Sequence, residues 1–187
     1  MNQETVRCFF AIVPPSGART EITSLIQILQ RQIDPILVRW TPEENLHVTL
    51  RFIGEFPKLA LTHLIKQTEV AISTIHTLDL TVNAITLFPD RHYPKTLALT
   101  FLDDSRLKQL ALMIEDCVTD CGVKPETRQF RPHLSLASFR EPNHVSIDDN
   151  FPPFQLKFLC NEIVILKSIT LPAGARYQLM HRFSLRD

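Results

Sequence analysis

The chain has 187 residues, of which 44% are hydrophobic, and this is enough to build one domain with a sizeable core. Its 20 basic and 20 acidic residues cancel, which argues against the broad positive surface that coats long nucleic-acid duplexes. Any contact with nucleic acid should therefore be local, and we expect residues 1–187 to form a single domain.

The first half of the chain predicts a strand, a helix and a strand, followed by a second helix and strand. An apolar run that ends at two prolines is typical of a core strand, because proline removes the backbone donor that a strand needs. Apolar residues then recur at helical spacing as far as Ile33, with Ser16 as a candidate N-cap. The expected elements are a strand at 7–13, a helix ending before Pro35, strands at 38–40 and 47–54, a helix after Pro57 and a strand at 78–87.

The second half repeats the order of strand, helix and strand. Asp103 and Asp104 are candidate caps for a helix with apolar residues from Leu107 to Val118, which Gly122 should close. This order predicts an α+β fold of two related lobes, in which two sheets meet at a cleft and helices cover their outer faces. The expected elements are strands at 96–101 and 131–137, a loop at 140–153, and antiparallel strands at 154–158, 163–166 and 177–185.

A pattern of histidine, apolar residue, hydroxyl residue and leucine occurs twice, at His47–Leu50 and at His133–Leu136. Alternate side chains of a strand share a face, so each copy should present one imidazole beside one hydroxyl and bury two apolar side chains. By the same alternation Arg51 should lie on the histidine face, as a candidate substrate contact, and Phe52 on the apolar face. Two such strands can line a single cleft.

Two facing imidazoles can act as general acid and general base in a displacement at phosphorus. Histidine has an ordinary pKa of about 6.5, and the reaction needs a base beside the attacking oxygen and an acid beside the departing one. His47 and His133 are the candidates for this pair. Thr49 and Ser135 can donate hydrogen bonds to phosphate oxygens, and Arg131 is a second candidate for a charged substrate contact.

Metal chemistry has less support in the sequence. Neither motif carries an adjacent carboxylate of the kind that magnesium or paired-metal sites recruit, and the four cysteines form no CxxC pair. A single zinc ion held by His47 and His133 stays open as an alternative, although no third ligand is evident. We therefore expect no metal and no cofactor. A serine hydrolase is disfavoured because the chain has no GxSxG motif.

The composition also bears on location and assembly. The start of the sequence lacks the apolar segment of a signal peptide, and no apolar run approaches the length that crosses a bilayer. We expect a cytoplasmic protein with reduced thiols and no membrane contact. Since no heptad pattern or large apolar stripe demands a partner, we expect a monomer.

Four segments of the sequence together resemble the two-histidine phosphoesterase superfamily. They are RCFFAI at 7–12, the stretch at 39–55 that begins Arg39-Trp40 and ends HVTLRFIGE, FRPHLSL at 130–136 and GARY at 174–177. Within the superfamily the chain looks most like the RNA 2',3'-cyclic phosphodiesterases, also called 2'-5' RNA ligases. The fold that this resemblance implies has two pseudo-symmetric lobes around a central cleft, each an antiparallel sheet with helices on its outer face.

The resemblance also implies a reaction, the metal-independent opening of a 2',3'-cyclic phosphate at an RNA end to leave a 2'-phosphomonoester. By family analogy His47 is the proton donor to the departing 3'-oxygen, His133 is the proton acceptor that activates water, and Thr49 and Ser135 hold the phosphate. The implied partners are RNA ends with a cyclic phosphate. Some family members also join tRNA halves through a 2'-5' linkage by the reverse reaction, without ATP.

One position departs from the family pattern, and two other functions stay open. Many relatives carry arginine where this chain has Ser138, and the nearest arginine here is Arg140, which leaves one phosphate or RNA contact open. The alternatives are a non-catalytic module that binds RNA ends or nucleotides, and a phosphodiesterase for 2'-5' linkages or small cyclic nucleotides. Among the other aromatic and imidazole side chains, core or surface positions are favoured for Phe9, Phe56, Phe130, His63, His76, His144 and His181, and His92 stays open.

Overall fold

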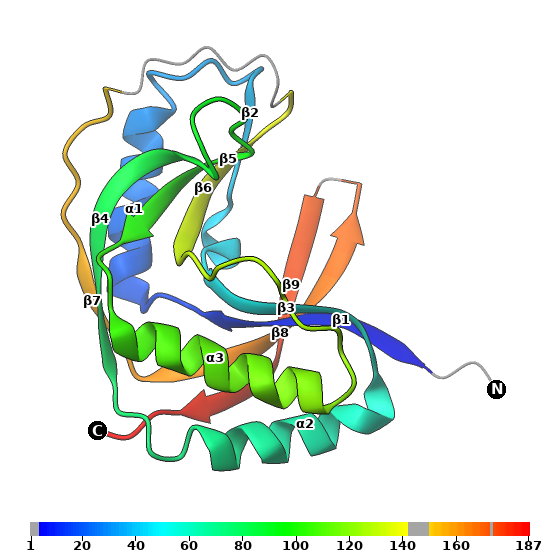
Figure 1. Ribbon diagram of the computed structural model, residues 1–187. Coiled ribbons are helices and arrows are strands. Elements are labelled where there is room, and N and C mark those ends of the chain that lie inside the picture. The colour runs from blue at the N-terminus through cyan, green and yellow to red at the C-terminus, as the bar shows by residue number, and fades with distance from the viewer. Residues whose placement is uncertain (1–3, 142–149, 173) are drawn as a thin grey trace.

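The protein is described by a computed structural model that covers residues 4–141, 150–172 and 174–187 (Figure 1). Part of the expected loop at 140–153, with His144, lies outside these residues. The remaining elements follow the expected order. They are β1 (Thr5–Ile12), α1 (Ser16–Leu29), β2 (Val38–Trp40), the short 3-10 helix η1 (Glu43–Asn45), β3 (Val48–Pro57), α2 (Lys58–Ala71), β4 (Leu78–Phe88), β5 (Thr96–Phe101), α3 (Ser105–Asp120), β6 (His133–Phe139), β7 (Lys157–Cys160), β8 (Glu162–Leu171) and β9 (Gly174–Ser184).

The strands of the described residues form one curled nine-stranded sheet (Figure 1). Its order is β7-β4-β5-β6-β3-β1-β8-β9, with β2 paired to β6, and neighbouring strands are antiparallel. The α+β fold with two antiparallel halves is thus confirmed. The two expected sheets are continuous, however, because β3 pairs with β6 at Val48 and Leu134. We call β3, β1, β8 and β9 the first half of the sheet. The second half consists of β7, β4, β5, β6 and β2.

The helices bury one face each, as their apolar spacing predicts. In α3 the Asp104 carboxylate accepts the backbone N–H of Arg106 at 2.8 Å, and Gly122 has a φ of 86°, so the predicted cap and stop are both confirmed. The expectation that Ser16 caps α1 is wrong. The carbonyl of Pro15 accepts the Arg19 N–H at 3.0 Å. Pro15 is therefore the N-cap residue, and Ser16 is already the first residue of the helix.

The end of α1 also differs from the expectation. The helix stops at Leu29, and the next residues form a turn in which the Ile33 N–H bonds to the Leu29 carbonyl at 3.0 Å. This turn buries Ile33, which is why the apolar spacing continues past the helix.

The core lies between the helices and one face of the sheet. Buried side chains of α1, α2 and α3 form a single cluster with apolar residues of β1, β3, β5 and β6. A smaller cluster of Phe9, Ala11, Val164 and Leu166 lies on the opposite face of β1 and β8, which we call the open face. No helix among the described residues is both long and apolar enough to cross a membrane.

Candidate active site

The contact between β3 and β6 brings the two histidine motifs together on the open face. Val48 and Leu134 are paired partners, and both are fully buried on the core side. When this antiparallel register is extended by one residue on either side, His47 stands opposite Ser135 and Thr49 opposite His133. The two histidines are then diagonal neighbours, a relation that separates Cα atoms by about 7–8 Å. The four motif side chains thus surround one point of the sheet.

Each imidazole is oriented by a hydrogen bond from its Nδ1 to the backbone carbonyl two residues earlier. The Nδ1 of His47 lies 2.6 Å from the carbonyl oxygen of Asn45, and the Nδ1 of His133 lies 2.9 Å from the carbonyl oxygen of Arg131. A carbonyl oxygen only accepts, so each Nδ1 carries a hydrogen and each Nε2 is the atom that gains or loses a proton. The Nε2 of His47 lies 3.1 Å from the hydroxyl of Thr49.

Burial lowers the pKa of both histidines below the ordinary value. For His47 burial is the largest cause, the Asn45 carbonyl works in the opposite direction, and the nearby charge of His133 lowers the pKa further. For His133 burial again dominates, opposed by the Arg131 carbonyl and assisted by the Arg131 charge. Both rings are therefore mainly neutral at pH 7 before a ligand binds.

Aromatic side chains hold each imidazole from the side. The ring of His47 lies 5.0 Å from the ring of Phe9 and 5.0 Å from that of Tyr177, the latter edge-on. His133 stacks on Phe88 with ring centres 3.9 Å apart, and the guanidinium of Arg131 covers Phe88 at 4.6 Å.

The core positions favoured for the aromatic residues are confirmed, and one of these residues also contacts a histidine. Phe9 is buried in the smaller cluster and its ring faces the imidazole of His47, while Phe56 is buried in the main core and Phe130 packs against it. No local signal marked Phe88 as a neighbour of His133. Tyr177 was marked only by the resemblance of the segment at 174–177.

Each motif ends in a β-bulge at its leucine. The residues on either side of Leu50 pair with consecutive residues of β1, so Leu50 is an extra residue in β3. The residues on either side of Leu136 likewise pair with consecutive residues of β5. A bulge reverses the alternation of side chains beyond it. The two motifs therefore share a backbone irregularity as well as a residue pattern.

The bulge at Leu50 makes the prediction for Arg51 wrong. Arg51 pairs with Phe10 of the main core rather than following Thr49 onto the open face, and it is 8% exposed. Its guanidinium forms an ion pair with Glu115 of α3 and donates to the Lys124 carbonyl at 2.6 Å. Phe52, expected on the apolar face, is 43% exposed and lies beside Phe9 on the open face. Arg51 is therefore a structural residue.

The departure at Ser138 can be placed on the sheet. Ser138 pairs with Thr96 of β5 and with Arg39 of β2, so an exposed guanidinium stands on the adjacent strand. The Nη1 of Arg39 lies 3.7 Å from the position of a Cβ built on Gly174, at the start of β9. Arg39 thus spans the space between β2 and β9.

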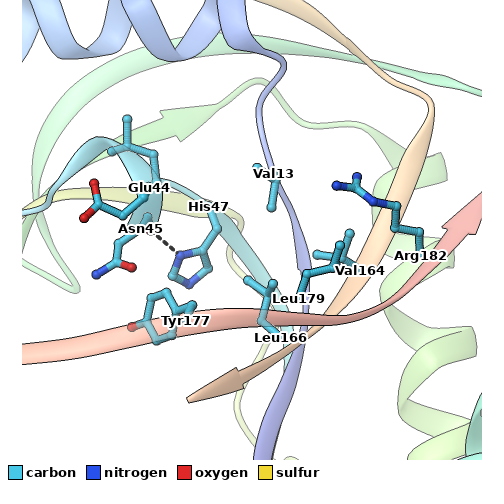
Figure 2. Close-up of a pocket in the computed structure, with 10 residues that line it drawn as sticks. Val13, Glu44, Asn45, His47, Val164, Leu166, Tyr177, Leu179 and Arg182 are labelled. Carbon is cyan, nitrogen blue, oxygen red and sulfur yellow. Dashed lines mark hydrogen bonds between the residues drawn. The ribbon is translucent and has the colours of Figure 1, made fainter. Parts of the chain in front are cut away.

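A cavity of about 180 Å³ opens beside His47 on the open face (Figure 2). Its walls come from η1, from the end of β1, and from β8 and β9, and they are mostly apolar. In the described residues, no three histidine, cysteine, aspartate or glutamate side chains gather in a metal-binding arrangement, here or elsewhere.

Comparison with known proteins gives relatives over nearly the whole chain. The family described as LigT like Phosphoesterase matches residues 12–98. The RNA 2',3'-cyclic phosphodiesterase of Methanocaldococcus jannaschii is 23% identical over 94% of this chain and 98% of its own length. That of Bacillus subtilis is 26% identical over 81% and 84%. The structure of E. coli LigT complexed with 3'-AMP superimposes with a TM-score of 0.83 at 25% identity, covering 98% of this chain and all of LigT.

Proposed function

We propose that this chain, which is similar to the LigT-like phosphoesterases in sequence and in fold, is a cyclic phosphodiesterase that opens the 2',3'-cyclic phosphate at RNA ends and leaves a 2'-phosphomonoester. The observation that carries the proposal is the single pairing of β3 with β6. When its register is extended by one residue on either side, two imidazoles and two hydroxyls meet at one point of the open face, which supports the proposal. The continuity of the sheet through this pairing supports treating residues 1–187 as one two-lobed domain.

In the proposed mechanism His133 is the general base and His47 the general acid. The Nε2 of neutral His133 takes a proton from water as the water oxygen attacks phosphorus. The bond from phosphorus to the 3'-oxygen breaks, and the protonated Nε2 of His47 gives its proton to that oxygen. The product keeps the phosphate on the 2'-oxygen and has a free 3'-hydroxyl. Proton exchange with water then returns both imidazoles to their starting states.

The surrounding groups fit these roles. Each Nδ1–H is held by a carbonyl, so each ring presents Nε2 to the phosphate. Thr49 and Ser135 stand opposite the two histidines in the extended register and supply hydroxyl donors for the phosphate oxygens, on which charge grows in the transition state. An anionic phosphodiester between the rings favours the imidazolium form of His47 and so offsets the effect of burial on its pKa.

We propose that the reaction needs no metal, because hydroxyl and aromatic side chains rather than carboxylates flank the two imidazoles. The same groups can join two RNA ends when an RNA 5'-hydroxyl takes the place of water. The 5'-oxygen then attacks phosphorus, the bond from phosphorus to the 3'-oxygen breaks, and the 2'-5' linkage forms with the energy of the cyclic ester.

The test is incubation with an RNA that ends in a 2',3'-cyclic phosphate, with and without EDTA, followed by identification of the hydroxyl that keeps the phosphate. We expect turnover that survives EDTA and a 2'-phosphate product. Loss of turnover in EDTA contradicts metal independence, and a 3'-phosphate product contradicts the assignment of the leaving oxygen. Binding of the RNA without turnover identifies a non-catalytic module.

A further inference from the structure

Residues 89–95 connect β4 to β5, and the hydrolytic step gives them no role; we call them the β4–β5 loop (green in Figure 1). The loop follows directly on Phe88, whose ring stacks on the His133 imidazole with ring centres 3.9 Å apart. Its two ends are joined, because the Lys95 N–H donates to the Phe88 carbonyl at 2.7 Å. The loop therefore begins one aromatic ring away from His133.

A single carboxylate fixes the middle of the β4–β5 loop. The Oδ1 of Asp90 accepts the backbone N–H of His92 at 2.8 Å and that of Tyr93 at 2.9 Å. The next residue, Pro94, is buried, whereas Tyr93 is 65% exposed. A tyrosine on a fixed backbone that is presented to solvent offers an aromatic surface on which a nucleobase can stack.

The β4–β5 loop carries more positive than negative charge. Arg91 and Lys95 are exposed on it, and Asp90 is its one carboxylate. The Arg131 guanidinium lies 4.6 Å from the centre of the Phe88 ring. The pKa of Asp90 is lowered by the two backbone N–H groups that it accepts, and further by positive charges that include Arg131. Single-stranded RNA suits such a surface, because its backbone is anionic and its bases stack on aromatic side chains.

The proposed mechanism determines which part of the substrate lies on this side. In a displacement at phosphorus, the attacking and departing oxygens are roughly in line on opposite sides of the phosphorus. The acid His47 stands beside the departing 3'-oxygen, so the ribose that carries the cyclic phosphate lies toward His47. The base His133 stands beside the attacking oxygen. The attacking group therefore arrives from the side of Phe88, Arg131 and the β4–β5 loop.

Resting on the proposed function, we infer that the β4–β5 loop and Arg131 bind a second RNA strand, one with a free 5'-hydroxyl, and hold it for 2'-5' joining. The first base of this strand stacks on Tyr93, and the phosphate after its first nucleotide lies against the Arg131 guanidinium. The 5'-oxygen attacks phosphorus and gives its proton to the Nε2 of His133. The bond from phosphorus to the 3'-oxygen breaks, and His47 protonates that oxygen.

The test measures joining and hydrolysis in one reaction, with an RNA that ends in a 2',3'-cyclic phosphate and a second RNA with a 5'-hydroxyl. We expect the wild-type protein to form a 2'-5'-linked product beside the hydrolysed RNA. Tyr93→Ala should lower the ratio of joined to hydrolysed product about tenfold, which is within the range that one base stacked on an aromatic side chain contributes. Tyr93→Phe keeps the ring and should keep the wild-type ratio. Leu59→Ala is the control, because Leu59 is 84% exposed on α2, which packs on the core face of the sheet.

A 5'-hydroxyl strand that lacks its first base tests the location of that base. Removal of the base should lower the ratio of joined to hydrolysed product about tenfold with the wild-type protein. With Tyr93→Ala it should have little further effect, because the aromatic ring on which the base stacks is already absent.

The outcomes separate the inference from the function on which it rests. If water does not open the cyclic phosphate, the proposed function fails and the inference fails with it. If water opens it but no 2'-5'-linked product forms at a saturating concentration of the 5'-hydroxyl strand, the inference is overturned while the function stands. It is also overturned if Tyr93→Ala lowers hydrolysis and joining alike, which would place the strand with the cyclic phosphate on Tyr93. Equal losses on base removal in Tyr93→Ala and the wild-type protein would overturn it as well.

Discussion

The first and second halves of the sheet each present one histidine on the open face, and they hold it with the same backbone device. A carbonyl two residues before the ring binds Nδ1, and a bulge follows at the leucine of the motif. The surroundings differ. His47 lies between two aromatic rings and next to a cavity, whereas His133 lies on one aromatic ring that an arginine covers.

This comparison separates what a repeated motif shares from what each copy adds. In the proposed mechanism the shared part orients two imidazoles toward the same phosphate, which both proton transfers require. The features that differ between the two copies lie outside the motifs. Arg51 and Ala137 follow equivalent bulges, but Arg51 is a buried ion-pair partner and Ala137 is a small buried side chain. Acid and base roles therefore have to come from the surroundings.

The largest effect should come from removing either histidine. His47→Ala and His133→Ala should each lower kcat by about a thousandfold, because each removes a proton-transfer group. The double variant should be little worse than either single variant, since the two groups act in one step. Steady-state kinetics with a cyclic-phosphate RNA measure this, with His63→Ala, at an exposed position of α2, as the control. Fully additive losses would indicate that the rings do not act together.

The next effect concerns stability and tests the bulge at Leu50. Arg51→Met should lower the free energy of unfolding by about 3 kcal/mol, because it leaves Glu115 and the Lys124 carbonyl without their buried partner. Arg128→Met, which breaks an exposed ion pair with Glu126, should cost less than about 1 kcal/mol.

Denaturant unfolding of the two arginine variants gives these values, and kinetics on the folded fraction complete the test. Arg51→Met should keep the kcat of the wild-type protein, since Arg51 faces the core. A stable Arg51→Met variant with a large loss of kcat would indicate that Arg51 contacts the substrate after all.

The limits of sequence reasoning follow from the same residues. The runs at 38–40 and 96–101 were predicted with the bounds of β2 and β5, because Pro35 and Pro42 lie close to the first run and Pro94 and Asp103 lie close to the second. The four motif residues were predicted on one face because the alternation holds as far as the leucine. A bulge adds one residue to a strand without any change in composition. The sequence therefore did not indicate that Arg51 and Phe52 lie on the faces opposite to those predicted.

Contacts between distant segments were out of reach for a related reason. The pairing of Val48 with Leu134, and the packing of Phe88 and Tyr177 on the histidines, join strands that no local pattern relates. The resemblance to a family supplied the meeting of the two motifs and marked the segment with Tyr177, but it indicated neither Phe88 nor the cavity.

A smaller effect should appear in the pH dependence. Since burial lowers the pKa of both histidines below 6.5, the maximum of kcat/KM should lie below pH 6.5, and the value should fall about tenfold for each pH unit above neutrality as the acid loses its proton. The profile of kcat should lie at higher pH, because the bound phosphodiester favours an imidazolium. Profiles of kcat/KM and kcat on one substrate measure both, and a kcat/KM maximum above pH 7.5 would contradict the lowered pKa values.

The smallest effect should distinguish the two halves at the second position after each bulge, where Phe52 and Ser138 correspond. Arg39 stands beside Ser138 on β2, so we expect it to supply the positive charge that relatives place at 138. Arg39→Gln should lower kcat/KM for RNA about fivefold and reduce the slope of log kcat/KM against log salt by about 0.7, the loss of one phosphate contact to a single strand.

Adding Ser138→Arg to that variant should restore both values, because the new guanidinium starts from the neighbouring strand on the same face. In the wild-type background Ser138→Arg should add little, since Arg39 already holds the contact. A fall in kcat/KM that salt does not change, or one that Ser138→Arg does not repair, would mean that Arg39 supports the start of β9 near Gly174 rather than the RNA.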